Sequence, residues 1–179
     1  MSNLSKEEIE RIFLSSNDFN ELFDAFENAI KQKIDDFELY QKLFWNSFLT
    51  IDEIILFGEK LVLVQPENSF EIFFWMANIF EALYSEKDNL EHAFNYYKKA
   101  SIVKPTSEIP FIKAFESFDQ DLNLPPIDNL IDFLKNGVEL VYKKGKIYKH
   151  LGNLYKIKGD PQHEEYYYSK AAEFGEDIN

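Results

Sequence analysis

The chain has 179 residues, a formal net charge of −13, and a content of 45% hydrophobic and 17% aromatic residues. This length allows one domain with a sizeable core, and the hydrophobic content excludes a disordered chain. The negative charge argues against general nucleic-acid binding, because most of the surface would repel a phosphate backbone; it favours solubility and basic partners.

Cysteine is absent, which excludes disulfides, thiolate metal sites and thiol chemistry. The N-terminal segment is polar and acidic, without the apolar core of a signal peptide. The most apolar stretch, residues 70–84, is interrupted by polar side chains and is shorter than the roughly 20 residues of a membrane-spanning helix. We therefore expect a cytoplasmic protein that does not bind membranes.

Four helices are predicted before Pro66, which ends the fourth. Their starts carry short polar side chains that cap helix N-termini, two of them in capping boxes, namely Ser5 with Glu8, Asn17-Asp18, Asp35-Asp36, and Thr50 with Glu53. Apolar residues recur at helical spacing after each start. They are Ile9, Ile12 and Phe13; Phe19, Leu22, Phe26, Ala29 and Ile30; Leu39, Tyr40, Leu43, Phe44 and Phe48; and Ile54, Ile55, Phe57, Leu61 and Val64.

The fifth predicted helix, from Ser69 to Tyr84, is apolar nearly all round, so we expect it to lie centrally. Phe73, Phe74 and Trp75 are consecutive and cannot all face one core. We hypothesise that one of them is exposed in a groove as a binding anchor.

Three further helices follow. Asn89 is predicted to cap the sixth helix, which ends at Pro105, and Thr106-Ser107 opens the seventh. The segment from Asp119 to Pro125 is a linker, and the eighth helix runs from about Ile127 to Tyr142. A glycine within this eighth helix costs about 1 kcal/mol relative to alanine.

The last stretch, residues 145–172, contains two short helical patterns broken at Gly159-Asp160-Pro161. Pro161 is well placed as the first residue of the second helix. Such a hairpin cannot bury its apolar faces alone, so we expect it to stack on neighbouring hairpins. Of the three consecutive tyrosines, we expect Tyr168 inside and Tyr166 or Tyr167 at the surface.

This stretch resembles a tetratricopeptide repeat (TPR), a helix-turn-helix of about 34 residues. The residues that carry the resemblance are Tyr148, Leu151-Gly152, Tyr155, Gly159-Asp160, Tyr168 and Ala171, and residues 84–105 resemble the family as well. The resemblance implies that Gly152 allows the paired helices to approach closely, and that Tyr155 and Tyr168 fill the wedge between them. It implies an all-α, TPR-like right-handed superhelix of antiparallel helical hairpins, with about ten helices in a single domain over residues 1–179.

Positive charge is concentrated near this last hairpin. Residues 135–158 contain seven lysines and one glutamate, a net charge of +6, so the rest of the chain carries −19. Lys146, Lys149, Asn153 and Lys156 step by three, four and three residues, which places them on one stripe of a helix. In TPR proteins these positions line the concave groove, and the resemblance implies that Lys149 and Asn153 clamp a partner's C-terminal carboxylate. The alternative is a solvated lysine face that balances an acidic body.

An enzyme is not indicated. His92, His150 and His163 each lack a second histidine at ligand spacing, and we expect all three at the surface. The chain has no phosphate-binding glycine loop and no nucleophile elbow. We therefore predict no catalytic residues, no metal site and no other cofactor.

The sequence thus predicts a non-catalytic protein–protein interaction scaffold or adaptor. Its concave groove would hold a peptide or helix of another protein, with an acidic segment or a C-terminus as the ligand of the lysine stripe. Two alternatives stay open: a self-assembling, homo-oligomeric structural scaffold, and an accessory subunit that regulates an enzyme.

Overall fold

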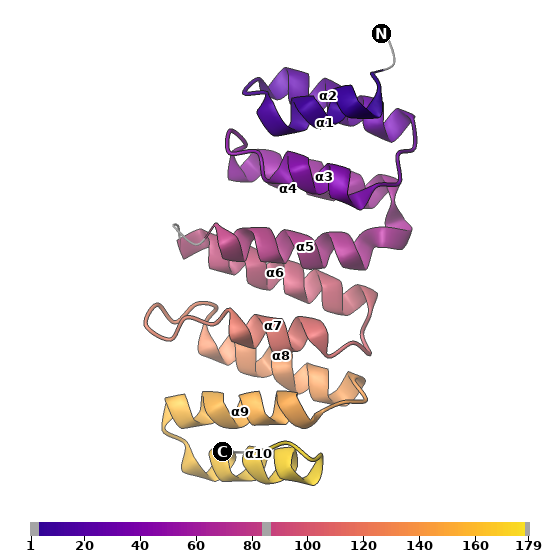
Figure 1. Cartoon of the computed structure of the whole chain (residues 1–179). Coiled ribbons are helices and arrows are strands. Elements are labelled where there is room, and N and C mark those ends of the chain that lie inside the picture. The colour runs from indigo at the N-terminus through magenta and orange to yellow at the C-terminus, as the bar shows by residue number, and fades with distance from the viewer. Residues whose placement is uncertain (1–3, 84–86, 178–179) are drawn as a thin grey trace. The chain divides into compact units, whose positions relative to one another are not determined.

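The computed structural model describes residues 4–83 and 87–177 (Figure 1). These residues form ten α-helices: α1 (Lys6–Ser15), α2 (Phe19–Lys31), α3 (Phe37–Phe44), α4 (Ile51–Val64), α5 (Ser69–Ala82), α6 (Lys87–Val103), α7 (Ile109–Glu116), α8 (Ile127–Leu140), α9 (Gly145–Lys158) and α10 (Pro161–Glu173). A short 3-10 helix covers Pro66–Asn68. The described part of the chain contains no β-strand, only an isolated bridge between Asp119 and Leu124. The predicted all-α fold of about ten helices is confirmed.

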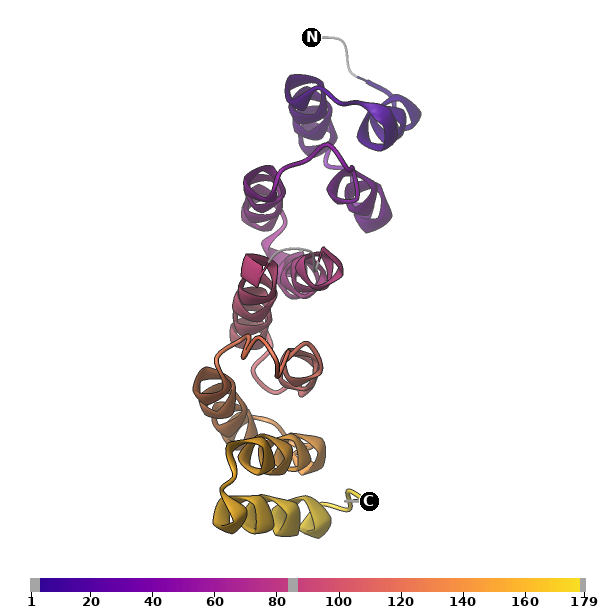
Figure 2. The ribbon, with the colours of Figure 1, turned by 90° about the vertical axis from the view of Figure 1, so that its left-hand side faces the viewer.

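The chain divides into two compact units, residues 1–66 and 67–179. The first unit contains α1 to α4, and the second contains α5 to α10. Within a unit, the first helices of successive hairpins lie side by side: α1 contacts α3, and α7 contacts α9 (Figure 2). One domain over residues 1–179 remains a prediction.

Most of the polar residues that were expected to start helices do so, but α7 begins at Ile109, after the predicted start at Thr106-Ser107. Ser5 with Glu8 and Thr50 with Glu53 form complete capping boxes. Aspartate side chains cap α2, α3 and α10 by accepting hydrogen bonds from first-turn N–H groups. These side chains satisfy backbone donors that have no partner within the helix, so local sequence alone decides where these helices begin.

Three further predicted boundaries were wrong. Helix α6 begins at Lys87, so Asn89 lies inside it; the buried amide of Asn89 instead donates a 2.5 Å hydrogen bond to the carbonyl of Leu83, at the end of α5. Helix α3 ends at Phe44, which leaves Phe48 outside it and 62% exposed. Helix α8 ends at Leu140, two residues early. Tyr84, the expected end of the fifth helix, lies outside the described residues.

Aromatic side chains fill the core of the first unit. The Phe26 ring of α2 lies between two rings, with centroids 5.9 Å from Tyr40 of α3 and 4.9 Å from Phe57 of α4. All three side chains are fully buried. The two hairpins of this unit therefore share one core, to which Phe19 and Phe23 of α2 also contribute through contacts with Phe57.

The apolar helix α5 pairs with α6 in the second unit. Trp75 is buried, while Phe73 and Phe74 are half-buried against Tyr96 and Tyr97 of α6. The hypothesis that one of these three side chains is an exposed anchor was therefore wrong, because the partner helix covers the rings that the core does not enclose.

The last hairpin confirms the predicted close approach at Gly152. A Cβ atom at Gly152 would lie 2.6 Å from two ring carbons of Tyr168. Tyr168 thus lies over Gly152 and is half-buried, whereas Tyr167 is buried and stacks on Tyr155 at 5.3 Å between centroids. Tyr166 is the exposed member of the three tyrosines. Gly137 in α8 has a matching role, because its Cβ would lie 2.7 Å from the ring of Phe111.

Candidate functional site

The four residues of the predicted stripe all lie on α9. Lys146 and Lys156, at its two ends, are exposed, whereas Lys149 and Asn153, in its middle, are half-buried. The expected periodicity is therefore present, but the two central side chains are already engaged within the chain. Whether the stripe binds a partner remains a prediction.

Each central side chain has an intramolecular hydrogen bond. The ammonium group of Lys149 donates to the backbone carbonyl of Asp177 at 2.5 Å. The side-chain oxygen of Asn153 accepts from the hydroxyl of Tyr168 at 2.7 Å. Asn153 therefore positions the ring that lies over Gly152, a role that the sequence pattern did not indicate.

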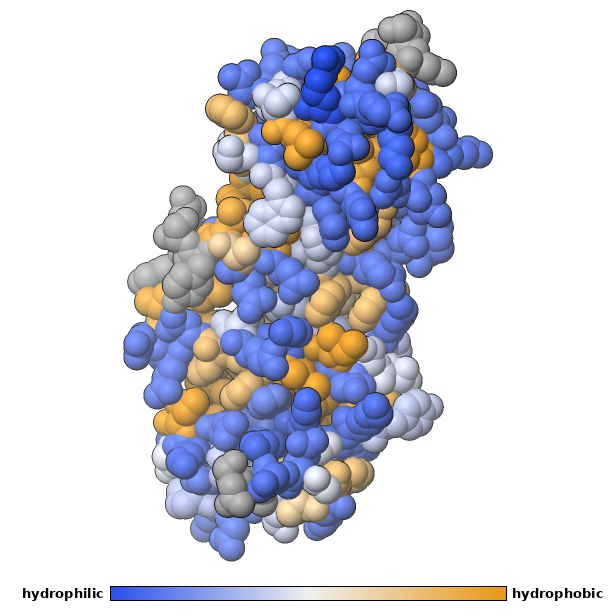
Figure 3. Space-filling model, in the orientation of Figure 1, coloured by the Kyte–Doolittle hydropathy of each residue, from blue (hydrophilic) through white to orange (hydrophobic). Residues whose placement is uncertain are grey.

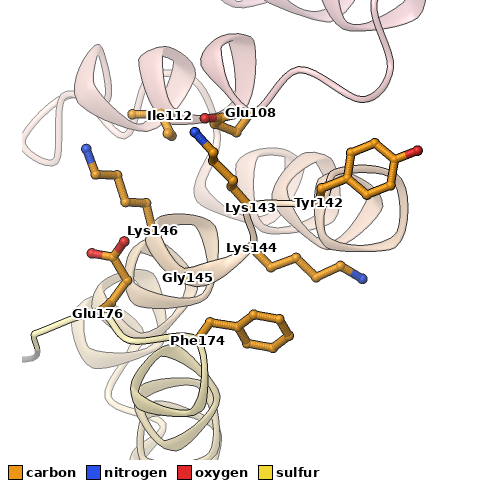
Figure 4. A pocket seen from close by; sticks show the side chains of 9 residues that line it. All are labelled: Glu108, Ile112, Tyr142, Lys143, Lys144, Gly145, Lys146, Phe174 and Glu176. Carbon is orange, nitrogen blue, oxygen red and sulfur yellow. The ribbon is translucent and has the colours of Figure 1, made fainter.

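A cavity of about 450 Å³ lies at the N-terminal end of the stripe. Lys143 and Lys144, from the link between α8 and α9, line it together with Lys146. Lys143 and Lys146 extend toward α7, where Glu108 and Ile112 lie (Figure 4). The cavity thus adds Lys143 and Lys144, which precede α9 and are not part of the predicted stripe.

The electrostatics of this cavity favour an anionic ligand. Helix α9 begins without a capping side chain, because Lys144 occupies the N-cap position and makes no side-chain cap hydrogen bond. The positive end of the helix dipole is therefore not offset by a capping side chain, although the Glu176 carboxylate lies near it, with its Oε1 3.3 Å from the position that a Cβ atom on Gly145 would take. Among the described acidic side chains, none forms an ion pair with Lys143, Lys144 or Lys146.

The other two lysines counted in this basic stretch are engaged elsewhere. Lys158 pairs with Asp128 of α8. The ammonium group of Lys135 lies 5.6 Å from the centroid of the Tyr155 ring, and its hydrogen bond with that tyrosine raises the pKa of Lys135. The candidate basic surface therefore consists of the other five lysines, Lys143, Lys144, Lys146, Lys149 and Lys156.

Residues 174–177 also line this surface, and we call them the tail segment. Phe174 and Glu176 form part of the cavity wall. The ring of Phe174 lies 5.5 Å from that of Tyr148. The sequence pattern did not indicate this position for the acidic residues, because nothing in their spacing shows that the chain turns back onto α9.

His150 corrects the prediction that all three histidines lie at the surface. Its ring stacks on Phe115 at 4.0 Å, and both ring nitrogens are buried without a hydrogen-bond partner among the described residues. Burial lowers the pKa of His150 to about 4, assisted by Lys146 and Lys149 and opposed by Glu116. The imidazole of His150 therefore stays neutral at neutral pH.

The first unit exposes apolar side chains on a different surface. A cavity of about 480 Å³ between α1 and α3 is lined by Leu14, which is 60% exposed, and by Trp45, which is 54% exposed. Figure 3 shows apolar side chains, in orange, at the surface of both units among mainly hydrophilic residues. The sequence predicted an exposed aromatic side chain on the fifth helix. The structure instead exposes Trp45, which follows the last residue of α3.

Among the described residues, no group of three or more histidine, aspartate or glutamate side chains is arranged to hold a metal ion. No helix in the part of the chain that the structure covers combines the length and the apolar character that a membrane crossing needs.

Comparison with known proteins identifies the fold. No protein-family model matches the chain, and no curated protein is significantly similar to it. A crystal structure of MamA is 17% identical, with a TM-score of 0.55 over 88% of this chain and 88% of that chain. The crystal structure of a thermophilic TPR protein in Thermus thermophilus is 20% identical, with a TM-score of 0.51 over 96% of this chain and 92% of that chain. These likenesses show a TPR-like all-α fold.

Proposed function

We propose that this chain is a non-catalytic scaffold that binds an acidic segment of a partner protein on the lysine surface, defined as Lys143, Lys144, Lys146, Lys149 and Lys156. The observation that carries the proposal is the cavity of about 450 Å³, which joins the lysines of the α8–α9 link to the end of the α9 stripe. A TPR-like fold supports the proposal, because stacked helical hairpins create extended surfaces that suit another polypeptide.

The chemistry of the surface matches a carboxylate ligand. Ammonium groups donate charge-assisted hydrogen bonds to carboxylates, and these are about twice as strong as bonds between neutral groups. A cavity wall shields such contacts from water more than a flat surface does, so the attraction is screened less. An extended acidic peptide would place one carboxylate in the cavity and others along the stripe.

The competing interpretation is a solvated lysine face that only offsets the acidic charge of the chain. Isolated ion pairs at an exposed surface contribute little, about 0–1 kcal/mol each. A solvated face therefore predicts weak association that does not depend on which lysines are present. The proposed site predicts that loss of the lysines beside the cavity matters more than loss of other lysines.

The test measures binding of a fluorescent acidic peptide by anisotropy at low and moderate salt. We expect Lys146→Glu with Lys156→Glu, which changes two exposed positions, to weaken binding at least tenfold. The matched control is Lys31→Glu with Lys33→Glu, which reverses the same charge on exposed residues of the first unit. Equal losses in the two double variants would contradict the proposal, because net charge alone would then explain the binding.

A second candidate is self-assembly, in which another copy supplies the acidic partner. Residues 1–66 carry six basic and thirteen acidic side chains, a net charge of −7, against +6 for residues 135–158. This complementarity favours head-to-tail contacts, which form rings or filaments. Light scattering distinguishes the two candidates: a particle mass that grows with concentration and shrinks with salt supports self-assembly, and a constant monomer mass excludes it.

A further inference from the structure

The tail segment, residues 174–177, is held against α9 by a defined turn. The N–H of Glu176 donates to the carbonyl of Ala171 at 3.1 Å, and the N–H of Gly175 donates to that of Ala172 at 3.0 Å. Gly175 has a φ angle of 80°, in the left-handed region. Together these form a Schellman motif, which ends α10 and redirects the chain.

After the turn, the tail segment contacts three positions on one face of α9. The ring of Phe174 lies against Tyr148, and the side chain of Glu176 occupies the space beside Gly145, where a Cβ atom would lie 2.5 Å from its Cγ. The carbonyl of Asp177 accepts the hydrogen bond of Lys149. Gly145, Tyr148 and Lys149 are spaced at i, i+3 and i+4, so they share one face of the helix.

These contacts place an acidic peptide on the lysine surface. Glu176 forms part of the wall of the cavity that Lys143 and Lys146 also line (Figure 4). Residues 173–177 carry three carboxylates and no basic side chain. The chain itself thus brings an acidic segment to the proposed place and holds it to Lys149 through the backbone carbonyl of Asp177.

We propose that the tail segment is an intramolecular occupant of the lysine surface, and that the partner's segment displaces it. This inference rests on the proposed function and specifies its ligand: an aromatic side chain that packs on Tyr148, followed by carboxylates at the cavity and a backbone carbonyl for Lys149. Gly145 fits this role, because the absence of a Cβ leaves room for the ligand's side chain.

The tail segment regulates access because it competes at high effective concentration. A peptide tethered next to its site is present at millimolar effective concentration, so a separate ligand binds with reduced apparent affinity. A segment that served only to end α10 would need the Schellman turn alone. The contact of the Glu176 side chain with Gly145 and that of the Asp177 carbonyl with Lys149 are not among the hydrogen bonds of this turn, so they are not needed to end α10.

The experiment uses the full chain and a synthetic fluorescent peptide with the sequence of residues 173–177. Gly175→Val places a β-branched side chain at a positive φ angle and so breaks the turn that directs the tail segment. Gly159→Val is the matched control, because Gly159 also has a positive φ of 70° and open space around it, but it lies between α9 and α10. We expect Gly175→Val to bind the peptide at least tenfold more tightly than the unmodified chain, and Gly159→Val to bind it as the unmodified chain does.

Each outcome decides between the two proposals. If the unmodified chain and Gly175→Val bind the peptide with equal affinity, the proposal that a partner displaces the tail segment is wrong, and the proposed function is not affected. A peptide that binds none of the variants would overturn both. Loss of the enhanced binding when Lys146→Glu and Lys149→Glu are added to Gly175→Val would support the assigned surface, and retention would overturn it.

A second variant tests the inference independently, in case Gly175→Val does not fold. Glu176→Lys leaves the turn intact and places a positive charge beside Lys146, so repulsion releases the tail segment. We expect a gain in peptide affinity in the same direction, with an unchanged circular dichroism spectrum. A folded Glu176→Lys variant with unchanged affinity would overturn the inference.

Discussion

The hydroxyl of Tyr97 on α6 donates a 2.7 Å hydrogen bond to the carboxylate of Glu81 on α5. The tyrosine hydroxyl gives the carboxylate of Glu81 a hydrogen-bond partner inside the hairpin. The Tyr97 side chain is fully buried. Burial, followed by the bond to Glu81, raises the pKa of Tyr97 well above its usual range.

We predict a loss of stability at alkaline pH that depends on Tyr97. The unfolded chain releases the tyrosine proton near pH 10, while the folded chain retains it, so the free energy of unfolding decreases as the pH rises above about 10. Tyr97→Phe should flatten this dependence and cost about 1.5–3 kcal/mol at neutral pH, because it removes a hydrogen bond to a charged acceptor. Urea unfolding measures both effects, with the exposed Tyr166→Phe as the control. An unchanged alkaline slope in Tyr97→Phe would contradict this prediction.

His150 should make the protein sensitive to acid. Its pKa is lowered to about 4 in the folded chain, against 6.5 unperturbed, so the unfolded state binds the proton first. Stability is therefore complete above pH 6.5 and decreases as the pH falls toward 4, by up to about 3 kcal/mol. His150→Phe keeps an aromatic ring against Phe115 and should remove this decrease, whereas the exposed His163→Gln should retain it. Chemical unfolding between pH 4 and 7 measures the effect; identical profiles of the two variants would exclude it.

Gly152→Ala should destabilise the last hairpin. The added methyl group meets the Tyr168 ring at 2.6 Å, which is a clash with a side chain held by its hydrogen bond to Asn153. Overpacking costs about 1–3 kcal/mol, against a gain of roughly 1 kcal/mol from the higher helix propensity of alanine. In a Tyr168→Ala background the same substitution should be neutral or stabilising, and thermal unfolding of the four variants gives the coupling energy. A coupling of zero would show that the two residues do not meet.

Asn46 should contribute strongly to the stability of the first unit. Its buried amide nitrogen donates 2.9 Å hydrogen bonds to the carbonyls of Phe13 and Ser16, and its oxygen accepts from the N–H of Phe48. Asn46→Ala leaves these buried backbone groups without partners, and we expect a loss of about 2–4 kcal/mol. Asn46→Asp keeps the shape and the acceptor but removes both donors, so it should be nearly as damaging. Asn17→Ala, at an exposed position, is the control, and a comparable loss there would contradict the assignment.

Helix starts and most of the core were predictable because they depend on local chemistry. Each of these signals acts within one helix, where the spacing along the sequence determines which side chains lie close together. Examples are the capping boxes at Ser5 and Thr50 and the spacing of the buried Phe26 and Leu151. Asn89 shows the limit of this argument. Asparagine is a good N-cap residue, but Asn89 lies inside α6, and its side chain donates a hydrogen bond to the carbonyl of Leu83 at the end of α5.

The candidate site was only half predictable, for a similar reason. The stripe of Lys146, Lys149, Asn153 and Lys156 follows from helical periodicity alone. The cavity and the tail segment bring together residues from α7, the α8–α9 link and the stretch after α10, which no periodicity relates. His150 was predicted to lie at the surface and stacks on Phe115 instead, because exposure depends on which neighbouring helix covers a position.

By itself, the sequence determined an all-α chain of paired helices with an acidic body and a basic α9, because composition, capping and a 3.6-residue period are properties of local segments. Only the tertiary structure decided that Glu176 and Asp177 lie on the lysine surface and that the ring nitrogens of His150 are buried, with the ring against Phe115. Those facts depend on the direction that a chain takes after a turn at Gly175 and on the packing of helices against one another, which no single segment specifies.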